Sequence, residues 1–339
     1  MKTLFCVLNW GLGHASRSSV LIQRLIQEGH DVTIASDGVA LTHLKKRFPD
    51  YSFLELPAYS VRYASSSMII NMAFQARKIL RAIEDEHSVV SAFCKDHNIE
   101  QIISDNRYGC YHHDLPSHLL SHQLRPIVPT SKFFAQLFYK KLDHYMAPFT
   151  SLWVPDHAPP DNLSGRLSTH SRDKIYKGFL SDLATYKIPK EERSYCYDIG
   201  LMLSGPEPTR SHLEERLLSI LKPLKHLQIF LVRGLPNEGT ISLNLPPHIH
   251  VFNHLHGQEL ATKLNGCKAL ICRSGYSTLM DLLCLDIDAL VIPTPGQTEQ
   301  VYLAEQMAKK LNYAMLSQKE VTYKRLTKAL ADLPAQLSF

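Results

Sequence analysis

No run of apolar residues in this sequence is long enough to cross a bilayer. The N-terminal run, Thr3–Leu8, is short and stops at Asn9 without a cleavage-type ending, so it predicts a buried first strand, not a secretory signal. The seven cysteines include no Cys-x-x-Cys pair, which argues against a cysteine zinc site and favours reduced thiols. We therefore expect a cytoplasmic protein.

The sequence also lacks a strong excess of one charge. Its 37 Lys and Arg residues oppose 32 Asp and Glu residues, which gives a net charge of +5 with histidine neutral. This balance is too weak and too dispersed to predict nucleic-acid binding. It suits an anionic substrate or an anionic membrane surface.

Metal and dinucleotide motifs are incomplete. Adjacent residues such as His112-His113-Asp114 rarely converge on one ion, and Asp286-Ile287-Asp288 falls where a connecting loop is expected. Gly11-Leu12-Gly13 does not complete a Gly-x-Gly-x-x-Gly fingerprint, which argues against a dehydrogenase. We expect no metal and no cofactor.

Strand-like apolar runs alternate with helical runs along the whole chain, which predicts an α/β fold of parallel sheets covered by helices. We expect two doubly wound Rossmann-like domains, residues 1–156 and 194–339, facing each other across a cleft. Residues 157–193, rich in Pro, Asp, Asn, Ser and charge, form the predicted connection. For the last helix, Lys319–Leu333, two positions stay open: it completes the second domain, or it packs back on the first.

A turn of small residues, Arg273–Thr278, follows a predicted strand and opens a helix. Free backbone N–H groups at such a helix start suit a phosphate, and Arg273 would add positive charge. One helical turn past Ser277, the carboxylate of Asp281 could accept both hydroxyls of a ribose. A serine-capped helix with no ligand is the alternative for this turn taken alone.

Two further loops, Ser204–Arg210 and Pro293–Gln300, follow strands at the same predicted sheet edge. Amide and carboxylate side chains at the start of the helix after Pro293 suit sugar hydroxyls, although acids there also favour the helix dipole. The predicted donor-binding residues are Gly205, Glu207, Arg210, Arg273, Ser274, Gly275, Tyr276, Ser277, Thr278, Asp281, Gln297, Thr298, Glu299 and Gln300.

In the first half, His14 opens a helix after a glycine turn and Asp105 follows the fourth predicted strand. Either side chain could act as general base. The alternatives are a helix-capping role for His14 and an Asx turn for Asp105. The remaining predicted acceptor-side residues are Gly13, Arg17, Arg107, Tyr108 and His122.

The run Met68–Phe74, followed by Arg77, Lys78 and Arg81, would suit contact with a membrane carrying a lipid-linked acceptor. The alternative is a helix with one core face and one solvated face. If Met68–Phe74 contacts a membrane, the protein would lie at the inner face of that membrane.

The element Cys272–Asp281 resembles the Cys/Ser-Arg-Ser/Ala-Gly-x-x-Thr-x-x-Glu signature of GT-B glycosyltransferases of the MurG-like family (glycosyltransferase family 28), with Asp281 in place of the ribose-binding Glu. Pro293–Gln300 matches that family's Pro loop and Gln-containing helix start, and Gly13-His14 matches the end of its N-terminal glycine loop. Ser204–Pro208 differs from the family's Gly-Gly-Ser-Gln-Gly loop. The resemblance implies that Glu299 and Gln300 bind donor sugar hydroxyls.

The expected function is that of an inverting, metal-independent hexosyltransferase that uses a UDP-sugar such as UDP-N-acetylglucosamine and a glycan or lipid-linked acceptor. Two alternatives stay open: a UDP-sugar epimerase or hydrolase on the same fold, and a non-catalytic sugar-nucleotide-binding protein. The sequence leaves open the acceptor, the sugar, the nucleotide base, the catalytic base and the oligomeric state.

Overall fold

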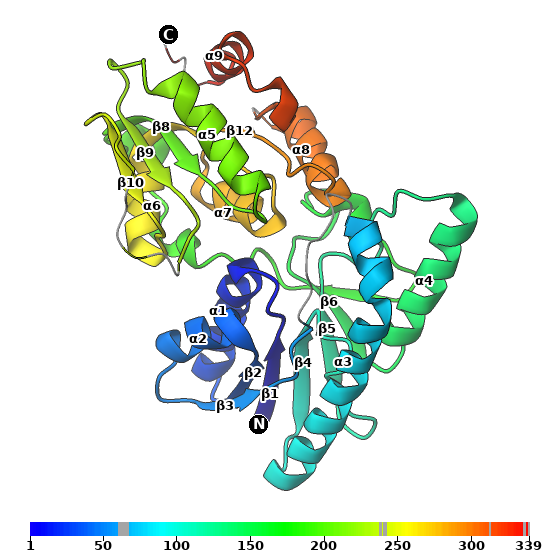
Figure 1. The fold of residues 1–339 in the computed structure, drawn as a ribbon. Helices are drawn as coiled ribbons and strands as arrows, with labels where there is room; N and C mark the ends of the chain where they lie inside the picture. Colours follow the sequence, from blue (N-terminus) through cyan, green and yellow to red (C-terminus); the bar gives the residue numbers. More distant parts are fainter. Residues whose placement is uncertain (60–67, 237–238, 240–242, 312, 335–336, 338–339) are drawn as a thin grey trace. The chain divides into compact units, whose positions relative to one another are not determined.

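The computed structural model describes residues 1–59, 68–236, 239, 243–311, 313–334 and 337, with the side chains of 68–74 and 76 excepted. The chain divides into two compact units, Met1–Asp182 and Leu183–Phe339 (Figure 1). The division falls inside the segment predicted as a connection, so residues 157–182 belong to the first unit. None of the described helices is both long and apolar enough to span a membrane.

The first unit is built on a seven-stranded parallel sheet with the order β3-β2-β1-β4-β5-β6-β7. The strand order reverses between β1 and β4, and the register pairs Val7 with Asp105, so the carboxyl ends of these two strands lie side by side. Such a switch point is where doubly wound sheets bind ligands. The strands are β1 (Lys2–Val7), β2 (Asp31–Ser36), β3 (Ser52–Glu55), β4 (Gln101–Asp105), β5 (Ser117–Leu120), β6 (Ser151–Val154) and β7 (Lys174–Tyr176).

The helices of the first unit connect these strands and bury one face each against the sheet. Val90 and Cys94 of the long α3 pack on Leu4 and Cys6, the residues of β1 that point to that face. The backbone of Met68–Phe74 starts α3, but its side chains are outside the described residues, so the membrane surface placed there stays a prediction. The helices are α1 (Leu12–Gln27), α2 (Gly38–Arg47), α3 (Met68–His97), α4 (Lys132–Met146) and the 3₁₀ helix η1 (Gly165–Ser168).

The second unit has a six-stranded parallel sheet with the order β10-β9-β8-β11-β12-β13. Its strands are β8 (Tyr197–Met202), β9 (Ile229–Val232), β10 (Ile249–Phe252), β11 (Cys267–Cys272), β12 (Ala289–Val291) and β13 (Ala314–Met315). Its helices are α5 (Thr209–Leu221), α6 (Gly257–Asn265), α7 (Tyr276–Leu285), α8 (Thr298–Lys310) and α9 (Tyr323–Ala331). Three 3₁₀ helices complete the chain: η2 (Asp182–Tyr186), η3 (Lys190–Glu192) and η4 (Gln318–Glu320).

The predicted α/β class with two doubly wound parallel sheets is confirmed, and the largest difference lies at the C-terminal end. The expected helix Lys319–Leu333 is divided into η4 and α9, because Thr322 accepts a hydrogen bond from the backbone N–H of Arg325 and starts a new helix. Leu326 and Leu330 of α9 are fully buried in the core of the second unit, beside Ile199 and Leu217.

A buried ionic network holds the first unit together around Arg107. Its guanidinium pairs with Glu86 of α3 and, at 2.7 Å, with Asp37 before α2, and it also donates to the carbonyl oxygen of Pro57. The side chains of Arg107 and Glu86 are fully buried. Gly109 has no space for a side chain, since a Cβ atom there would lie 2.2 Å from the carbonyl oxygen of Ile83. The network therefore fixes α3 against the β4 loop.

Replacing Glu86 by Ala should lower the free energy of unfolding by about 3–5 kcal/mol, because a buried guanidinium would lose its main partner. Urea unfolding followed by circular dichroism measures the change. The neighbouring exposed Asp85→Ala is the matched control and should change stability by less than about 0.5 kcal/mol. Equal effects of the two substitutions would contradict the structural role of the network.

Candidate functional site

The first group of predicted site residues lies at the switch point of the first sheet. Helix α1 begins at Leu12, before His14, because Gly11 takes a φ of 81° that favours glycine and ends the preceding loop. His14 therefore lies in the first turn of α1, and Arg17 lies one turn further on. The conformation of Gly11, and not only the predicted Gly13, therefore shapes the turn that leads into α1.

Asp105, at the end of β4, is the centre of this group and is completely buried. Its Oδ2 atom accepts hydrogen bonds from Nε of Arg17 at 2.9 Å and from the hydroxyl of Ser18 at 2.7 Å. Its Oδ1 atom contacts Nη2 of Arg17 and, at 3.0 Å, Nδ1 of His14. Burial alone would raise the pKa of Asp105, but the charge of Arg17 and these hydrogen bonds hold the pKa well below its usual range. Asp105 is therefore an anion with both oxygens occupied.

The imidazole of His14 is the exposed edge of the group, with 15% of its side chain accessible. Burial lowers its pKa, and the nearby charge of Arg17 lowers it further, so the ring is neutral at neutral pH. The Nδ1 atom lies 3.0 Å from Asp105 and 2.9 Å from Nη2 of Arg17. When Nδ1 carries the proton and donates it to Asp105, Nε2 is left with a lone pair.

His122 joins the same group, whereas Arg107 and Tyr108 do not. Nδ1 of His122 lies 3.0 Å from Nη1 of Arg17, and the residue is 6% exposed. Arg107 is fully buried in the network with Glu86, which leaves its guanidinium unavailable to an acceptor. Tyr108 packs against the apolar cluster around Phe149, and burial raises its pKa to about 12.

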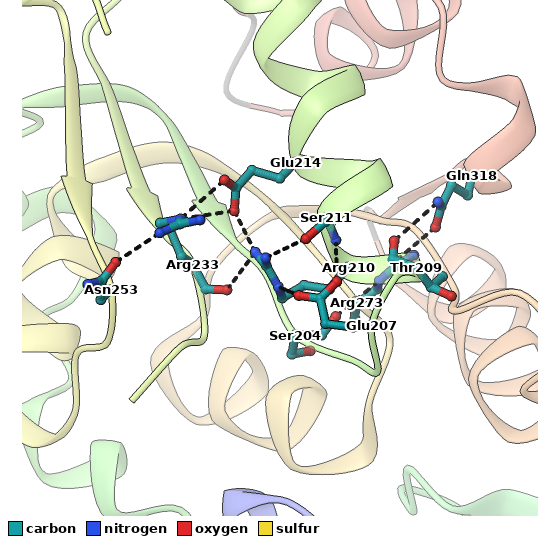
Figure 2. A network of polar contacts seen from close by, with 10 residues as sticks. All are labelled: Ser204, Glu207, Thr209, Arg210, Ser211, Glu214, Arg233, Asn253, Arg273 and Gln318. Carbon is teal, nitrogen blue, oxygen red and sulfur yellow. Dashed lines mark hydrogen bonds and ion pairs between the residues drawn. The ribbon is translucent and has the colours of Figure 1, made fainter. Parts of the chain in front are cut away.

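The second group surrounds Arg273, which follows β11 and is 1% exposed. The register aligns Met202 of β8, Cys272 of β11 and Val291 of β12, so the loops after these three strands meet. All five N–H donors of the guanidinium are used inside the protein, and Figure 2 shows those that bind Ser204, Thr209 and Gln318. They donate to the carbonyl oxygens of Ser204, Thr209, Ile292 and Pro293 and to Oε1 of Gln318. Arg273 thus joins the predicted donor loops to one another from the interior of the protein.

The charge of Arg273 has no carboxylate partner among the described residues. Burial lowers its pKa to about 10, which still leaves it positive at neutral pH. Beside it, the hydroxyl of Thr294 is buried and has no hydrogen-bond partner in the described parts of the chain, and the residue is 1% exposed. A Cβ atom at Gly205, where φ is 109°, would lie 3.4 Å from this hydroxyl and 4.0 Å from Nε of Arg273. The guanidinium of Arg273, which no described carboxylate neutralises, and the hydroxyl of Thr294 therefore both lie next to Gly205.

Two of the predicted donor contacts support the loops from inside. The hydroxyl of Ser274 donates to the carbonyl oxygen of Gln300 at 2.7 Å. The side-chain oxygen of Gln300 accepts from the backbone N–H of Thr294 at 2.8 Å, and its amide nitrogen donates to Gln297 at 2.6 Å. Tyr276 is 3% exposed and belongs to the core. These polar side chains fix the loop after β12 against the start of α7.

The other predicted donor residues keep partly exposed positions. Gly275 is the N-cap of α7 and has a φ of −68°, so its backbone needs no glycine, and a Cβ atom there would meet only Thr278 at 3.9 Å. The contacts of the remaining half-buried residues with a donor stay predictions; these residues are Ser277, Thr278, Asp281, Gln297, Thr298 and Glu299.

Arg210 differs from Arg273 because carboxylates neutralise it. It pairs with Glu207 and Glu214, and Glu214 in turn accepts from Nε of Arg233 at 3.1 Å (Figure 2). Arg233 also donates to Asn253 at 3.2 Å. The sequence prediction omitted Glu214, Arg233, Asn253, Thr294 and Gln318. A signal existed for Arg233 and Asn253, because each directly follows a strand of the sheet, β9 or β10, at the edge where ligands bind.

Among the described residues, no three His, Cys, Asp or Glu side chains are placed to hold a metal ion. What the two groups offer is a neutral imidazole backed by a carboxylate in the first unit, and a buried cation beneath the loops beside a helix N-terminus in the second. The first suits proton transfer and the second suits a phosphate.

Comparison with protein families gives two matches. Residues 220–337 match the glycosyltransferase family 28 C-terminal domain, and residues 1–121 match glycosyl transferase family 1. No curated protein matches the chain. Each family match lies within one unit of the structure.

Solved structures with the same fold include several glycosyltransferases. The glycotransferase of kitacinnamycin is 16% identical with a TM-score of 0.69, over 99% of this chain and 92% of that one. The spinosyn rhamnosyltransferase SpnG, complexed with thymidine diphosphate, is 15% identical with a TM-score of 0.66, over 98% and 91%. MurG of Acinetobacter baumannii is 13% identical with a TM-score of 0.58, over 96% and 88%.

These identities are low, so the solved structures establish the fold, which is GT-B. The family matches carry the activity, and the match over residues 220–337 confirms the resemblance drawn from Cys272–Asp281. Residues 1–121, which include Gly13-His14, match a different glycosyltransferase family. The chain is a glycosyltransferase of the GT-B fold, and residues 220–337 of its second unit match the glycosyltransferase family 28 C-terminal domain.

Proposed function

We propose that the protein is an inverting hexosyltransferase that transfers a sugar from a UDP-sugar, such as UDP-N-acetylglucosamine, to a hydroxyl of a glycan or lipid-linked acceptor. The observation that carries the proposal is the buried, carboxylate-free cation of Arg273 beside the unused hydroxyl of Thr294. Both lie where the loops after β8, β11 and β12 meet, which is the ligand-binding edge of the sheet.

The donor diphosphate would lie over Gly205 and the N-terminus of α7. There it would accept hydrogen bonds from backbone N–H groups and, after a local shift of the loop at Gly205 that uncovers it, from the buried hydroxyl of Thr294. Arg273 does not contact the diphosphate, because its N–H donors are occupied. It attracts the diphosphate through the electrostatic field of its positive charge instead. Two opposite unit charges about 8 Å apart attract by about 2 kcal/mol at an effective dielectric constant of 20. This attraction and the helix dipole supply leaving-group stabilisation without requiring a metal.

Around the diphosphate, Asp281 would bind the ribose and Glu299 the sugar hydroxyls. Asp281 lies on α7 and Glu299 in the first turn of α8, and both are half-buried. Gln300 supports the site from inside, because its amide already bonds to Thr294 and Gln297. We therefore assign the sugar contact to Glu299 and a positioning role to Gln300.

In the reaction, the acceptor oxygen attacks the anomeric carbon while the bond from that carbon to the phosphate oxygen breaks. The electron pair leaves with the diphosphate, and the acceptor proton goes to Nε2 of His14. Asp105 holds the imidazole by its Nδ1 proton and stabilises the imidazolium that forms, while Arg17 keeps Asp105 ionised. Asp105 is thus a positioning residue, because both of its oxygens are occupied and its lowered pKa makes it a poor base.

Thr294→Val should weaken UDP binding about tenfold or more, because a hydrogen bond to a charged group is lost. The substitution keeps the side-chain shape, and the hydroxyl has no protein partner to lose, so thermal stability should not fall. Isothermal titration calorimetry with UDP measures the affinity. Thr262→Val, on the surface of α6, is the control and should bind UDP normally. Unchanged affinity of Thr294→Val would remove the main support for the donor site.

His14→Gln should reduce kcat by about 10²–10⁴-fold with little change in the affinity for the donor, because the general base is removed. The neutral imidazole is the active form, and its pKa is lowered below 6.5. The acid limb of the wild-type profile of kcat/KM should therefore lie below pH 6.5 and disappear in the variant. A wild-type acid limb above pH 6.5, or full activity of the variant, would reject His14 as the base.

A thermal-shift screen tests the nucleotide. UDP should raise the melting temperature more than GDP or dTDP, because selective binding to the native state stabilises it. The same preparation, incubated with the UDP-sugar and no acceptor, should release little UDP. Fast release would identify a hydrolase, epimer formation would identify an epimerase, and a larger shift with dTDP would change the donor base.

A further inference from the structure

Helix α4 of the first unit carries two separate apolar faces. One face packs inward, where Met146 is 1% exposed and Leu142 lies against the cluster around Phe149. Tyr139, one turn before, faces the same way and donates its hydroxyl proton to the carbonyl oxygen of Pro126 at 2.9 Å. This inward face accounts for the attachment of α4 to the unit and leaves the other apolar face unexplained.

The second face is formed by Phe133, Phe134, Leu137 and Phe138, which are 67%, 60%, 57% and 37% exposed. The spacing i, i+1, i+4 and i+5 places them in one stripe on the first two turns of the helix. Phe133, Phe134 and Leu137 are the three most exposed large hydrophobic side chains in the described parts of the chain. In Figure 1, α4 is a peripheral helix of the first unit. We call these four residues the α4 stripe.

Basic residues stand at both ends of the α4 stripe. Lys132 precedes it, and the exposed Lys140 and Lys141 follow it, Lys141 being one turn past Leu137 on the same side. The one acidic residue of α4, Asp143, pairs with Arg125 at 2.7 Å and with His170 at 3.1 Å. The stripe is therefore an aromatic surface with cationic ends and no unpaired acid on its own helix.

The surface is small. At roughly 200 Å² for each large side chain, the exposed fractions leave about 400 Å² of apolar stripe, about half of what each partner buries in a standard protein interface. A symmetric dimer through this face would also bring lysines of both copies together at the ends of the stripe, Lys140 and Lys141 against the same lysines or against Lys132, which is unfavourable. Charge and size both favour an anionic lipid surface, where aromatic side chains enter the interface and lysines reach the headgroups.

We propose that α4 is a peripheral membrane-docking element, in which the α4 stripe inserts into the interface of a bilayer and Lys132, Lys140 and Lys141 bind its anionic headgroups. The inference goes beyond the proposed function, because it requires neither a donor nor catalysis. It also differs from the membrane contact predicted from Met68–Phe74, which lies on another helix.

Vesicle flotation with the full chain tests the proposal. The protein should float with vesicles of phosphatidylcholine and phosphatidylglycerol, bind weakly to pure phosphatidylcholine, and dissociate as the salt concentration rises. Phe133→Ser combined with Phe134→Ser should reduce the bound fraction about tenfold or more, and so should Lys140→Glu combined with Lys141→Glu. Tyr323→Ser is the matched control, because Tyr323 is 53% exposed on α9, and it should float like the wild type.

All variants change exposed side chains, so their melting temperatures and UDP affinities should equal those of the wild type. Absence of wild-type flotation, or equal flotation of the double Phe variant, overturns the proposal. So does a wild-type dimer that the Phe substitutions dissociate, because the stripe would then be an interface between copies. Failure of the donor predictions leaves this result untouched, since flotation is measured without nucleotide.

Discussion

The second unit depends on one buried guanidinium. Arg273 uses its five donors to bind four backbone carbonyl oxygens and one side-chain oxygen, which come from the loops after β8 and β12, the start of α5 and η4. The planar, fixed geometry of arginine allows this, and lysine could not reproduce it. Because no described carboxylate balances the charge, the same residue that joins the loops also gives their surface a positive potential.

The charges of Arg17 and Arg273 are balanced in opposite ways. In the first unit, Arg17 forms an ion pair with Asp105, so its positive charge keeps that carboxylate ionised. The carboxylate in turn orients the imidazole of His14. In the second unit, Arg273 is left unbalanced, while Arg210 nearby is neutralised by Glu207 and Glu214. A neutral imidazole and an unbalanced cation are what proton transfer and phosphate binding respectively require.

The sequence pattern identified the ligand edge of each sheet but not the role of each side chain there. Small-residue turns after strands predicted where Arg273, Ser274 and Gln300 lie. They did not reveal that these polar groups point inward, because a hydrogen bond to a distant carbonyl leaves no periodic signal in a sequence. Thr294 was missed for the same reason, since only the surrounding loops make its hydroxyl buried and unpartnered.

Alternating strands and helices in the sequence thus determined the α/β class and the parallel sheets, since these depend on local periodicity and turn chemistry. The residues Cys272–Asp281 determined the family resemblance. Tertiary structure decided the ion pairing. Whether a charge is balanced depends on burial and on neighbours far apart in the chain, as with Arg17 and Asp105 or Arg107 and Glu86. Likewise, only packing determined which aromatic residues of α4 stay exposed.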